Sequence, residues 1–86
     1  MTSRFQPDDS IDLHGYSPDA AMEQLRRRVE TSRRKGSSLE VVHGHGRYIL
    51  RDRVREYGLH SPLVKQVWNG EDLFLPGGGG VTVFFF

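Results

Sequence analysis

Two histidine–glycine motifs determine how this chain can fold: Ile11-Asp12-Leu13-His14-Gly15 and His43-Gly44-His45-Gly46. Each motif ends a short apolar run and precedes a stretch with helical periodicity. If both runs are parallel strands, the motifs reach the same edge of one sheet, where open α/β sheets bind their ligands. That arrangement predicts one crevice holding three histidines, an aspartate and flexible glycine backbone.

The pattern around the motifs predicts the order β-α-β-α-β-β. Alternating or β-branched apolar residues predict strands, and stripes of apolar residues at spacings of three and four predict helices. Ser17 followed by Pro18 is typical of a helix start, while Gly36 and Gly58 are typical of helix ends. The expected strands are 11–14, 39–43, 63–68 and 81–86, and the expected helices are 18–35 and 47–57.

These elements predict an α/β chain of the α+β two-layer sandwich type. Strands separated by helices pair in parallel through right-handed crossovers, and the last strand can turn back antiparallel. The expectation is a four-stranded mixed sheet with two helices on one face. Residues 1–9 are expected to form a flexible leader, and residues 10–86 a single domain. The glycine run 77–80 is expected to act as a flexible hinge.

Composition narrows the class of protein. The 86 residues include no cysteine, which excludes a disulfide framework and any cysteine-based zinc site. No apolar run approaches the roughly 20 residues of a membrane span, and the N-terminus lacks a signal-peptide core. We therefore expect a soluble, cytoplasmic protein without a membrane partner. The expected oligomeric state is a monomer, with a dimer as the alternative.

Positive charge is concentrated in the middle of the chain. Residues 26–55 carry ten Lys and Arg against three acidic side chains, a net of +7, although the whole chain carries only +1. Such a cluster is typical of a protein that binds a polyanion. A solvated helix face is the plainer alternative.

The motif residues can support phosphate chemistry. Gly44 and Gly46 allow close approach of the backbone to a ligand, and Gly46 opens a helix whose N–H groups favour an anion. Arg47 at the helix start would add a full positive charge, and His45 and Arg51 are further candidates for phosphate binding. His14 or His43 could transfer a proton, with Asp12 as its orienting group or as a metal ligand. RNA could be cleaved without metal through its 2′-hydroxyl, whereas DNA requires attack by water, which favours a divalent cation such as Mg²⁺ or Mn²⁺.

Other interpretations of the same residues remain open. Asp12 and His14 could be a structural pair, and the second motif could be a tight turn with a helix cap. Three histidines and an aspartate would also allow a transition-metal site, although their spacing matches no standard zinc pattern. Two further functions compete with catalysis: a non-catalytic nucleic-acid-binding module, and a protein-interaction adaptor that uses Phe84-Phe85-Phe86.

Taken together, these motifs resemble the small MutS-related (Smr) domain family. Ile11–Gly15 resembles its Leu-Asp-Leu-His-Gly motif, and His43–Gly46 resembles its His-Gly-x-Gly motif. Leu50-Arg51 and the glycine-rich approach to Val81 also fit the family layout. The likeness covers about residues 10–86. Position 45 is often Lys or Arg in the family, so His45 is a departure that makes the charge there depend on pH.

The resemblance implies a βαβαββ fold similar to the C-terminal domain of translation initiation factor three. It also implies nucleic-acid binding, and in some members nicking or endonucleolytic cleavage of branched DNA or structured RNA, including at the ribosome. Carried over by position, the site would comprise Asp12, His14, His43 and Gly44–Gly46, with Arg47 and Arg51 holding phosphates. We therefore predict a nucleic-acid-binding domain with endonuclease activity.

Overall fold

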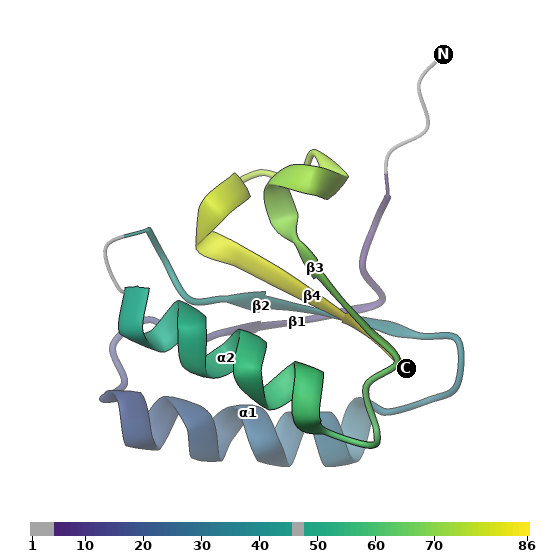
Figure 1. Ribbon diagram of the computed structural model, residues 1–86, viewed down its shortest axis with the longest axis horizontal. Coiled ribbons are helices and arrows are strands. Elements are labelled where there is room, and N and C mark those ends of the chain that lie inside the picture. The colour runs from purple at the N-terminus through teal and green to yellow at the C-terminus, as the bar shows by residue number, and fades with distance from the viewer. Residues whose placement is uncertain (1–4, 46–47) are drawn as a thin grey trace.

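The computed structural model describes residues 5–45 and 48–86 and shows four strands with two helices (Figure 1). The chain runs in the order β1 (Asp9–Asp12), α1 (Pro18–Ser32), β2 (Ser38–Val42), α2 (Tyr48–His60), β3 (Gln66–Asn69), η1 (Gly70–Leu73), η2 (Gly78–Gly80) and β4 (Val81–Phe85), where η marks a short 3₁₀ helix. The predicted βαβαββ order is confirmed.

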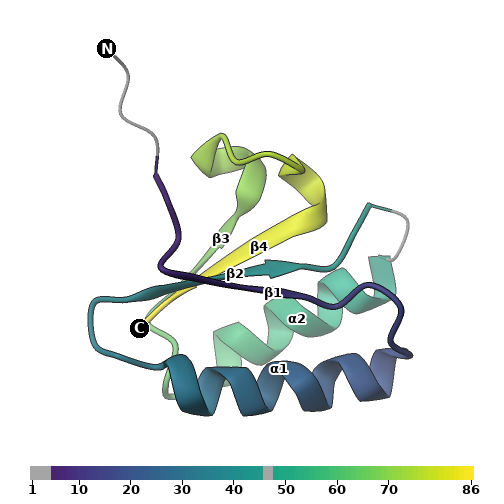
Figure 2. The same ribbon diagram turned by 180° about the vertical axis from the view of Figure 1, so that it is seen from behind.

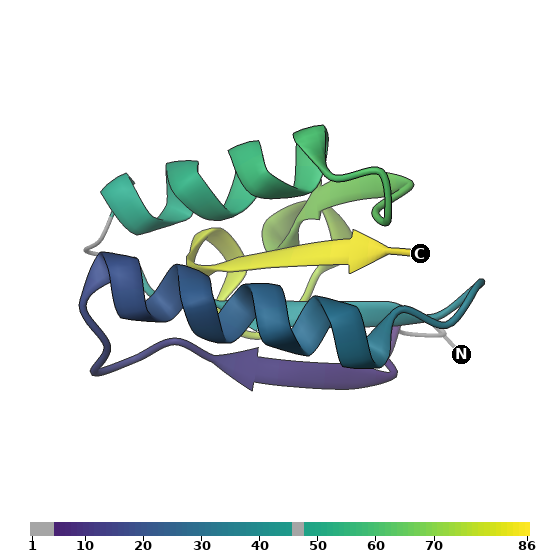
Figure 3. The same cartoon turned by 90° about the horizontal axis from the view of Figure 1, so that it is seen from below.

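The four strands form one mixed sheet in the order β1-β2-β4-β3. β1 pairs in parallel with β2, and β4 runs antiparallel to both of its neighbours, β2 and β3. Both helices cover the same face of this sheet, as the views from behind and from below show (Figures 2 and 3). The predicted two-layer sandwich is therefore correct, including the reversed last strand.

The core lies between the helices and the sheet. Its side chains come from alternate strand positions and from one stripe of each helix, and full burial of each stabilises the fold by about 1.5–3 kcal/mol. The completely buried members include Leu13, Leu25, Val29, Leu39, Val41, Leu50, Val54 and Phe84. This packing fixes which sheet residues face the helices and which face away from them.

Several predicted boundaries are wrong by a few residues. β1 begins at Asp9 and ends at Asp12, earlier than the predicted 11–14, and β3 begins at Gln66 rather than at Leu63. Helix α1 starts at Pro18 with Ser17 as its N-cap, as predicted, but ends at Ser32. Residue 47 lies outside the described residues, so the predicted start of α2 is not described.

Gly58 does not end α2, which continues to His60. A Cβ built on Gly58 would lie 2.5 Å from Cε1 of Phe84 and 2.8 Å from Cγ2 of Val67. Glycine is needed there because the helix packs closely on the sheet. The helix-end prediction failed because this requirement comes from distant residues.

The terminal phenylalanines divide between the two faces of the sheet. Phe84 is fully buried and Phe86 is 5% exposed, whereas the ring of half-buried Phe85 lies 5.3 Å from that of Phe5. All three rings therefore have intramolecular cover, which gives the adaptor interpretation little support.

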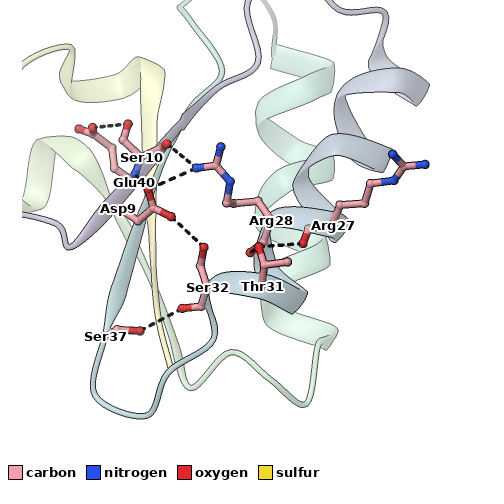
Figure 4. Close-up of polar contacts among 8 residues, drawn as sticks. All are labelled: Asp9, Ser10, Arg27, Arg28, Thr31, Ser32, Ser37 and Glu40. Carbon is pink, nitrogen blue, oxygen red and sulfur yellow. Dashed lines mark hydrogen bonds and ion pairs between the residues drawn. The ribbon is translucent and has the colours of Figure 1, made fainter.

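The amino ends of β1 and β2 are joined by a polar network (Figure 4). Asp9 accepts hydrogen bonds from the Ser32 hydroxyl at 2.8 Å and from Arg28 at 3.3 Å, and Arg28 also donates to the Ser10 carbonyl at 2.8 Å. Asp8 accepts from the backbone N–H of Ser38 at 2.9 Å. These contacts attach β1 to the last turn of α1 and to β2.

No helix in the described part of the chain has the length and apolar character needed to cross a membrane.

Candidate functional site

The first motif forms the turn between β1 and α1. The N–H of Leu13 donates to the Val42 carbonyl at 2.9 Å, which extends the pairing with β2 by one residue. The Asp12 carboxylate accepts the backbone N–H of His14 at 2.8 Å, and Gly15 has a φ of +87°. The side chains of Asp12 and His14 are exposed. Asp12 therefore shapes the turn that presents His14.

The second motif continues directly from β2 and is attached to η2. The backbone N–H groups of His43 and Gly44 both donate to the carbonyl oxygen of Gly80, at 2.9 and 3.0 Å. Gly44 has a φ of +87°, a conformation that favours glycine. These bonds place the His43–His45 turn against the glycine segment that leads into β4.

The His43 ring is buried, with 2% of the residue exposed, and both of its nitrogens have partners. Nδ1 lies 3.2 Å from the Gly44 carbonyl. Because a carbonyl can only accept, this contact assigns the proton to Nδ1. The unprotonated Nε2 then accepts from the Thr82 hydroxyl at 2.9 Å, and the Thr82 oxygen accepts from Nε of Arg55 at 3.4 Å. A continuous donor–acceptor chain thus runs from Arg55 to Gly44.

Burial lowers the pKa of His43 below its ordinary value of 6.5, because the charged ring would lose hydration. The bond to the Gly44 carbonyl acts in the opposite direction. The neighbouring side chains of Arg55, Arg51 and His45 lower the pKa of His43 further. The neutral ring is therefore the form that the fold favours.

The side chains of Asp12 and His43 point to opposite faces of the sheet. In β1, Asp12 alternates with the core residues Ile11 and Leu13, so its side chain points away from the helices. His43 follows the alternation of Leu39 and Val41 and points toward the helices. Within the described residues, no hydrogen bond joins the side chain of Asp12 or His14 to His43. The two motifs share an edge of the sheet but present different faces of it.

The glycine run 77–80 forms a turn that packs closely against the second motif. A Cβ on Gly80 would lie 3.1 Å from both the Gly44 carbonyl carbon and Nδ1 of His45. A Cβ on Gly79 would lie 3.9 Å from Cδ2 of His45 and from an oxygen of Glu71. The expected hinge is instead the 3₁₀ turn η2, followed directly by β4.

Helix α2 supplies cations to this edge. The Arg51 guanidinium lies 4.6 Å from the centre of the Tyr48 ring, and Nε of Arg51 donates to Asp52 at 3.1 Å. Arg55 lies one turn later and reaches Thr82. The other two residues predicted to bind phosphate, Gly46 and Arg47, lie outside the described residues.

Two residues of the site were missing from the predicted set. Arg55 carried a usable signal, because it follows Arg51 by four positions and shares its helix face. Thr82 carried a weaker one: it is the polar member of an apolar strand, on the same face as Phe84. Its partnership with His43 spans 39 positions and depends on β4 pairing with β2.

Metal binding requires several ligands at one point. Among residues 5–45 and 48–86, no three His, Asp or Glu side chains converge closely enough to hold a metal ion. A groove of about 830 Å³ lies elsewhere, between the helices and the turn after α2. It is lined by Met22, Arg26, Glu30, Arg53, Glu56, Tyr57, His60, Ser61, Pro62 and Leu63. None of the motif residues lines this groove.

Comparison with known proteins matches residues 11–86 to the Smr domain. The chain is 32% identical over 76 residues to the ribosome rescue factor SmrB of Tolumonas auensis, covering 80% of this chain and 44% of that protein. It is 39% identical over 49 residues to SmrB of Buchnera aphidicola, covering 56% of this chain and 26% of that protein. The chain thus spans less than half the length of these curated relatives.

A solved structure gives the same result for the fold. The crystal structure of the Smr domain of Thermus thermophilus MutS2 superposes with a TM-score of 0.76 at 27% sequence identity, covering 90% of this chain and 95% of that one. The correspondence therefore includes both helices and the sheet.

Proposed function

This chain belongs to the Smr domain family, and we propose that it binds nucleic acid at the edge formed by the His43–His45 turn and cleaves phosphodiester bonds there. The relatives named ribosome rescue factors favour structured RNA, with the ribosome as a partner, over branched DNA. A ribosomal partner would also place the chain in the cytoplasm.

The observation that carries this proposal is the group of cations around one buried histidine. Arg55, Arg51 and His45 all lie close enough to His43 to lower its pKa. A phosphate entering this edge would meet their positive charge, and arginine can bind phosphate oxygens through two N–H groups at once. The bound phosphodiester would thereby offset a concentration of positive charge that the fold itself creates.

The structure supports different roles for His14 and His43. His43 is buried with both ring nitrogens engaged, so we assign it to positioning the turn, Thr82 and Arg55. His14 is exposed, and in the described part of the chain its ring makes no hydrogen bond, so it can exchange a proton with a substrate. Asp12 holds the His14 backbone through its carboxylate. We therefore place proton transfer on His14.

On RNA, this assignment gives a balanced reaction. The 2′-hydroxyl gives its proton to the His14 imidazole while its oxygen attacks the neighbouring phosphorus. The bond from phosphorus to the 5′-oxygen breaks, and that oxygen takes a proton from solvent. This proposal requires the nucleic acid to pass around the edge of the sheet, so that a phosphate held by Arg51 and Arg55 also reaches His14. The two arginines would then counter the charge that develops on the phosphate oxygens. The products are a 2′,3′-cyclic phosphate and a free 5′-hydroxyl.

Cleavage assays on purified protein test the proposal. Structured RNA and branched DNA are incubated with the wild type and with an Asp12→Ala/His14→Ala double variant, each with Mg²⁺ and with EDTA. We expect the wild type to cleave RNA in both conditions and the double variant to lose that activity. Equal background cleavage by the two proteins would exclude catalysis at this site.

A second candidate is a non-catalytic binding module. It is favoured by the separation of Asp12 and His43 on opposite faces of the sheet, which leaves His14 without a second described catalytic side chain. The module predicts steep salt dependence of binding, because phosphate contacts release counterions, and no cleavage of any substrate. Binding without cleavage under every condition would select it.

A further inference from the structure

An exposed aromatic ring stands beside the cations of the proposed site. Tyr48 begins the described part of α2 and is 62% exposed. One side of its ring is covered by the guanidinium of Arg51, 4.6 Å from the ring centre. The other face of the ring is a flat apolar surface with a polar hydroxyl at its edge, which a second planar group can cover by stacking.

Arg51 can serve two parts of one ligand. Its planar group stacks on Tyr48 while its Nε is held by Asp52 at 3.1 Å. Within the described residues its two terminal nitrogens make no hydrogen bond, so they remain available as phosphate donors. The open ring face and the phosphate donors therefore belong to one preorganised unit.

We propose that Tyr48 and Arg51 form a stacking site for an unpaired nucleotide, with its base on the open face of the Tyr48 ring and its phosphate on Arg51. Bases within a duplex are stacked on each other and cannot cover a protein ring, whereas unpaired bases stack readily on aromatic side chains. This inference rests on the proposed function and specifies the strand state of its substrate.

The test measures binding of fluorescent oligonucleotides by anisotropy, using single-stranded RNA, single-stranded DNA and a duplex of equal length. Three variants of Tyr48 distinguish the effect of an aromatic ring from that of apolar volume. Tyr48→Phe keeps the ring, Tyr48→Leu keeps only apolar volume, and Tyr48→Ala keeps neither. Leu59→Ala is the matched control, because Leu59 is 72% exposed near the far end of the same helix. Oligonucleotides carrying 2-aminopurine report stacking directly through quenching of their fluorescence.

We expect Tyr48→Leu and Tyr48→Ala to weaken single-strand binding by about 5- to 100-fold, the range for loss of one stacked base. Tyr48→Phe and Leu59→Ala should bind like the wild type, and quenching should persist only where a ring remains. Duplex binding should change little in any variant.

Unchanged single-strand affinity in Tyr48→Ala, or an equal loss for duplex and single strand, would overturn the stacking site. If the stacking site is overturned but the wild type still binds with steep salt dependence, the proposed nucleic-acid binding is retained. If the wild type binds none of the oligonucleotides, both proposals are wrong.

Discussion

Charged side chains have different bonding partners at the two ends of the sheet. At the amino ends of β1 and β2, Asp9 is bonded to Arg28, Ser32 and the Ser10 N–H, as Figure 4 shows for the side chains. At the carboxyl ends, Arg55 reaches the Thr82 hydroxyl and the backbone turns on glycine. Among the described residues, neither Arg55 nor His45 forms an ion pair.

This difference distinguishes charged groups that stabilise the fold from charged groups that remain available to bind a ligand. A carboxylate surrounded by donors of its own protein has little capacity left for a ligand. A guanidinium bonded only to a neutral hydroxyl keeps its full charge and most of its donors. We therefore expect changes at the amino end to alter stability, and changes at the carboxyl end to alter both stability and binding.

The largest expected effect is on nucleic-acid affinity. An Arg51→Gln/Arg55→Gln variant should bind RNA on the order of 100-fold more weakly, because two charged hydrogen bonds of about 1.5 kcal/mol each are lost. Its slope of log affinity against log salt should be shallower by about 2, one unit for each phosphate contact. Anisotropy titrations at several salt concentrations measure both quantities.

The matched control removes two arginines from the other end. Arg34 lies at that end, where its carbonyl accepts the N–H of Ser37 just before β2. Arg28→Gln/Arg34→Gln lowers the net charge by the same amount but should leave affinity and salt slope close to those of the wild type. If both double variants lose affinity equally, binding depends on overall charge and the contrast between the two ends is wrong.

The next effect compares two hydroxyls. Thr82→Val keeps the side-chain shape but leaves the buried Nε2 of His43 without a donor, which should lower the free energy of unfolding by about 1–3 kcal/mol. Ser32→Ala removes the hydroxyl that bonds Asp9 in a partly solvated place, where water can substitute, so the loss should be smaller, about 0.5–1 kcal/mol. Urea unfolding of both variants at neutral pH measures the difference. A larger loss for Ser32→Ala would contradict the assigned His43 hydrogen-bond chain.

A third effect is the response of the carboxyl end to acid. Since burial lowers the pKa of His43 below 6.5, the unfolded chain takes up this proton more readily than the folded one. Stability should therefore be fully present above pH 6.5 and decline as the pH falls through the lowered value. NMR titration of the His43 ring and urea unfolding across this range test it. A His43 resonance that titrates at or above 6.5 would contradict the prediction.

The smallest effect belongs to Asp9. The Ser32 hydroxyl, with the Ser10 N–H and Arg28, lowers its pKa below 3.8, so its stabilisation is present above 3.8 and is lost as the pH falls through the lowered value. The side chain is 43% exposed, so solvent screens the pair and Asp9→Asn should cost less than about 1 kcal/mol at neutral pH. The difference from the wild type should vanish in acid, as followed by urea unfolding. A difference that persists there would show that Asp9 acts through packing.

The fold was largely predictable because its signals are local. Ser17 and Pro18 start α1 as expected: the Ser17 hydroxyl accepts the N–H of Ala20 at 3.3 Å. The order of strands and helices followed from the same kind of short-range pattern. Predicted helix and strand boundaries were wrong where residues distant in the sequence determine them. At Gly58, for example, Phe84 and Val67 leave no room for a Cβ.

From the sequence, only the location of the site at one edge of the sheet could be predicted. The two motifs could be placed there from the rule that parallel strands end together. The orientation of His43 toward the helices and its bond to Thr82 depend on the register in which Val41 faces Thr82. Neither motif contains that information. The different roles that we propose for His14 and His43 therefore could not be inferred from the sequence alone.

The place of β4 has a consequence for the order of folding. β4 is the last strand in the sequence, yet it lies between β2 and β3. Until it inserts, β3 has no partner in the sheet, and His43 lacks both the Gly80 carbonyl and the Thr82 hydroxyl. Contacts this distant along the chain form late, because a long loop must close before they stabilise anything. We therefore expect the sheet to close and the turn of the second motif to become ordered in the same step, when β4 inserts.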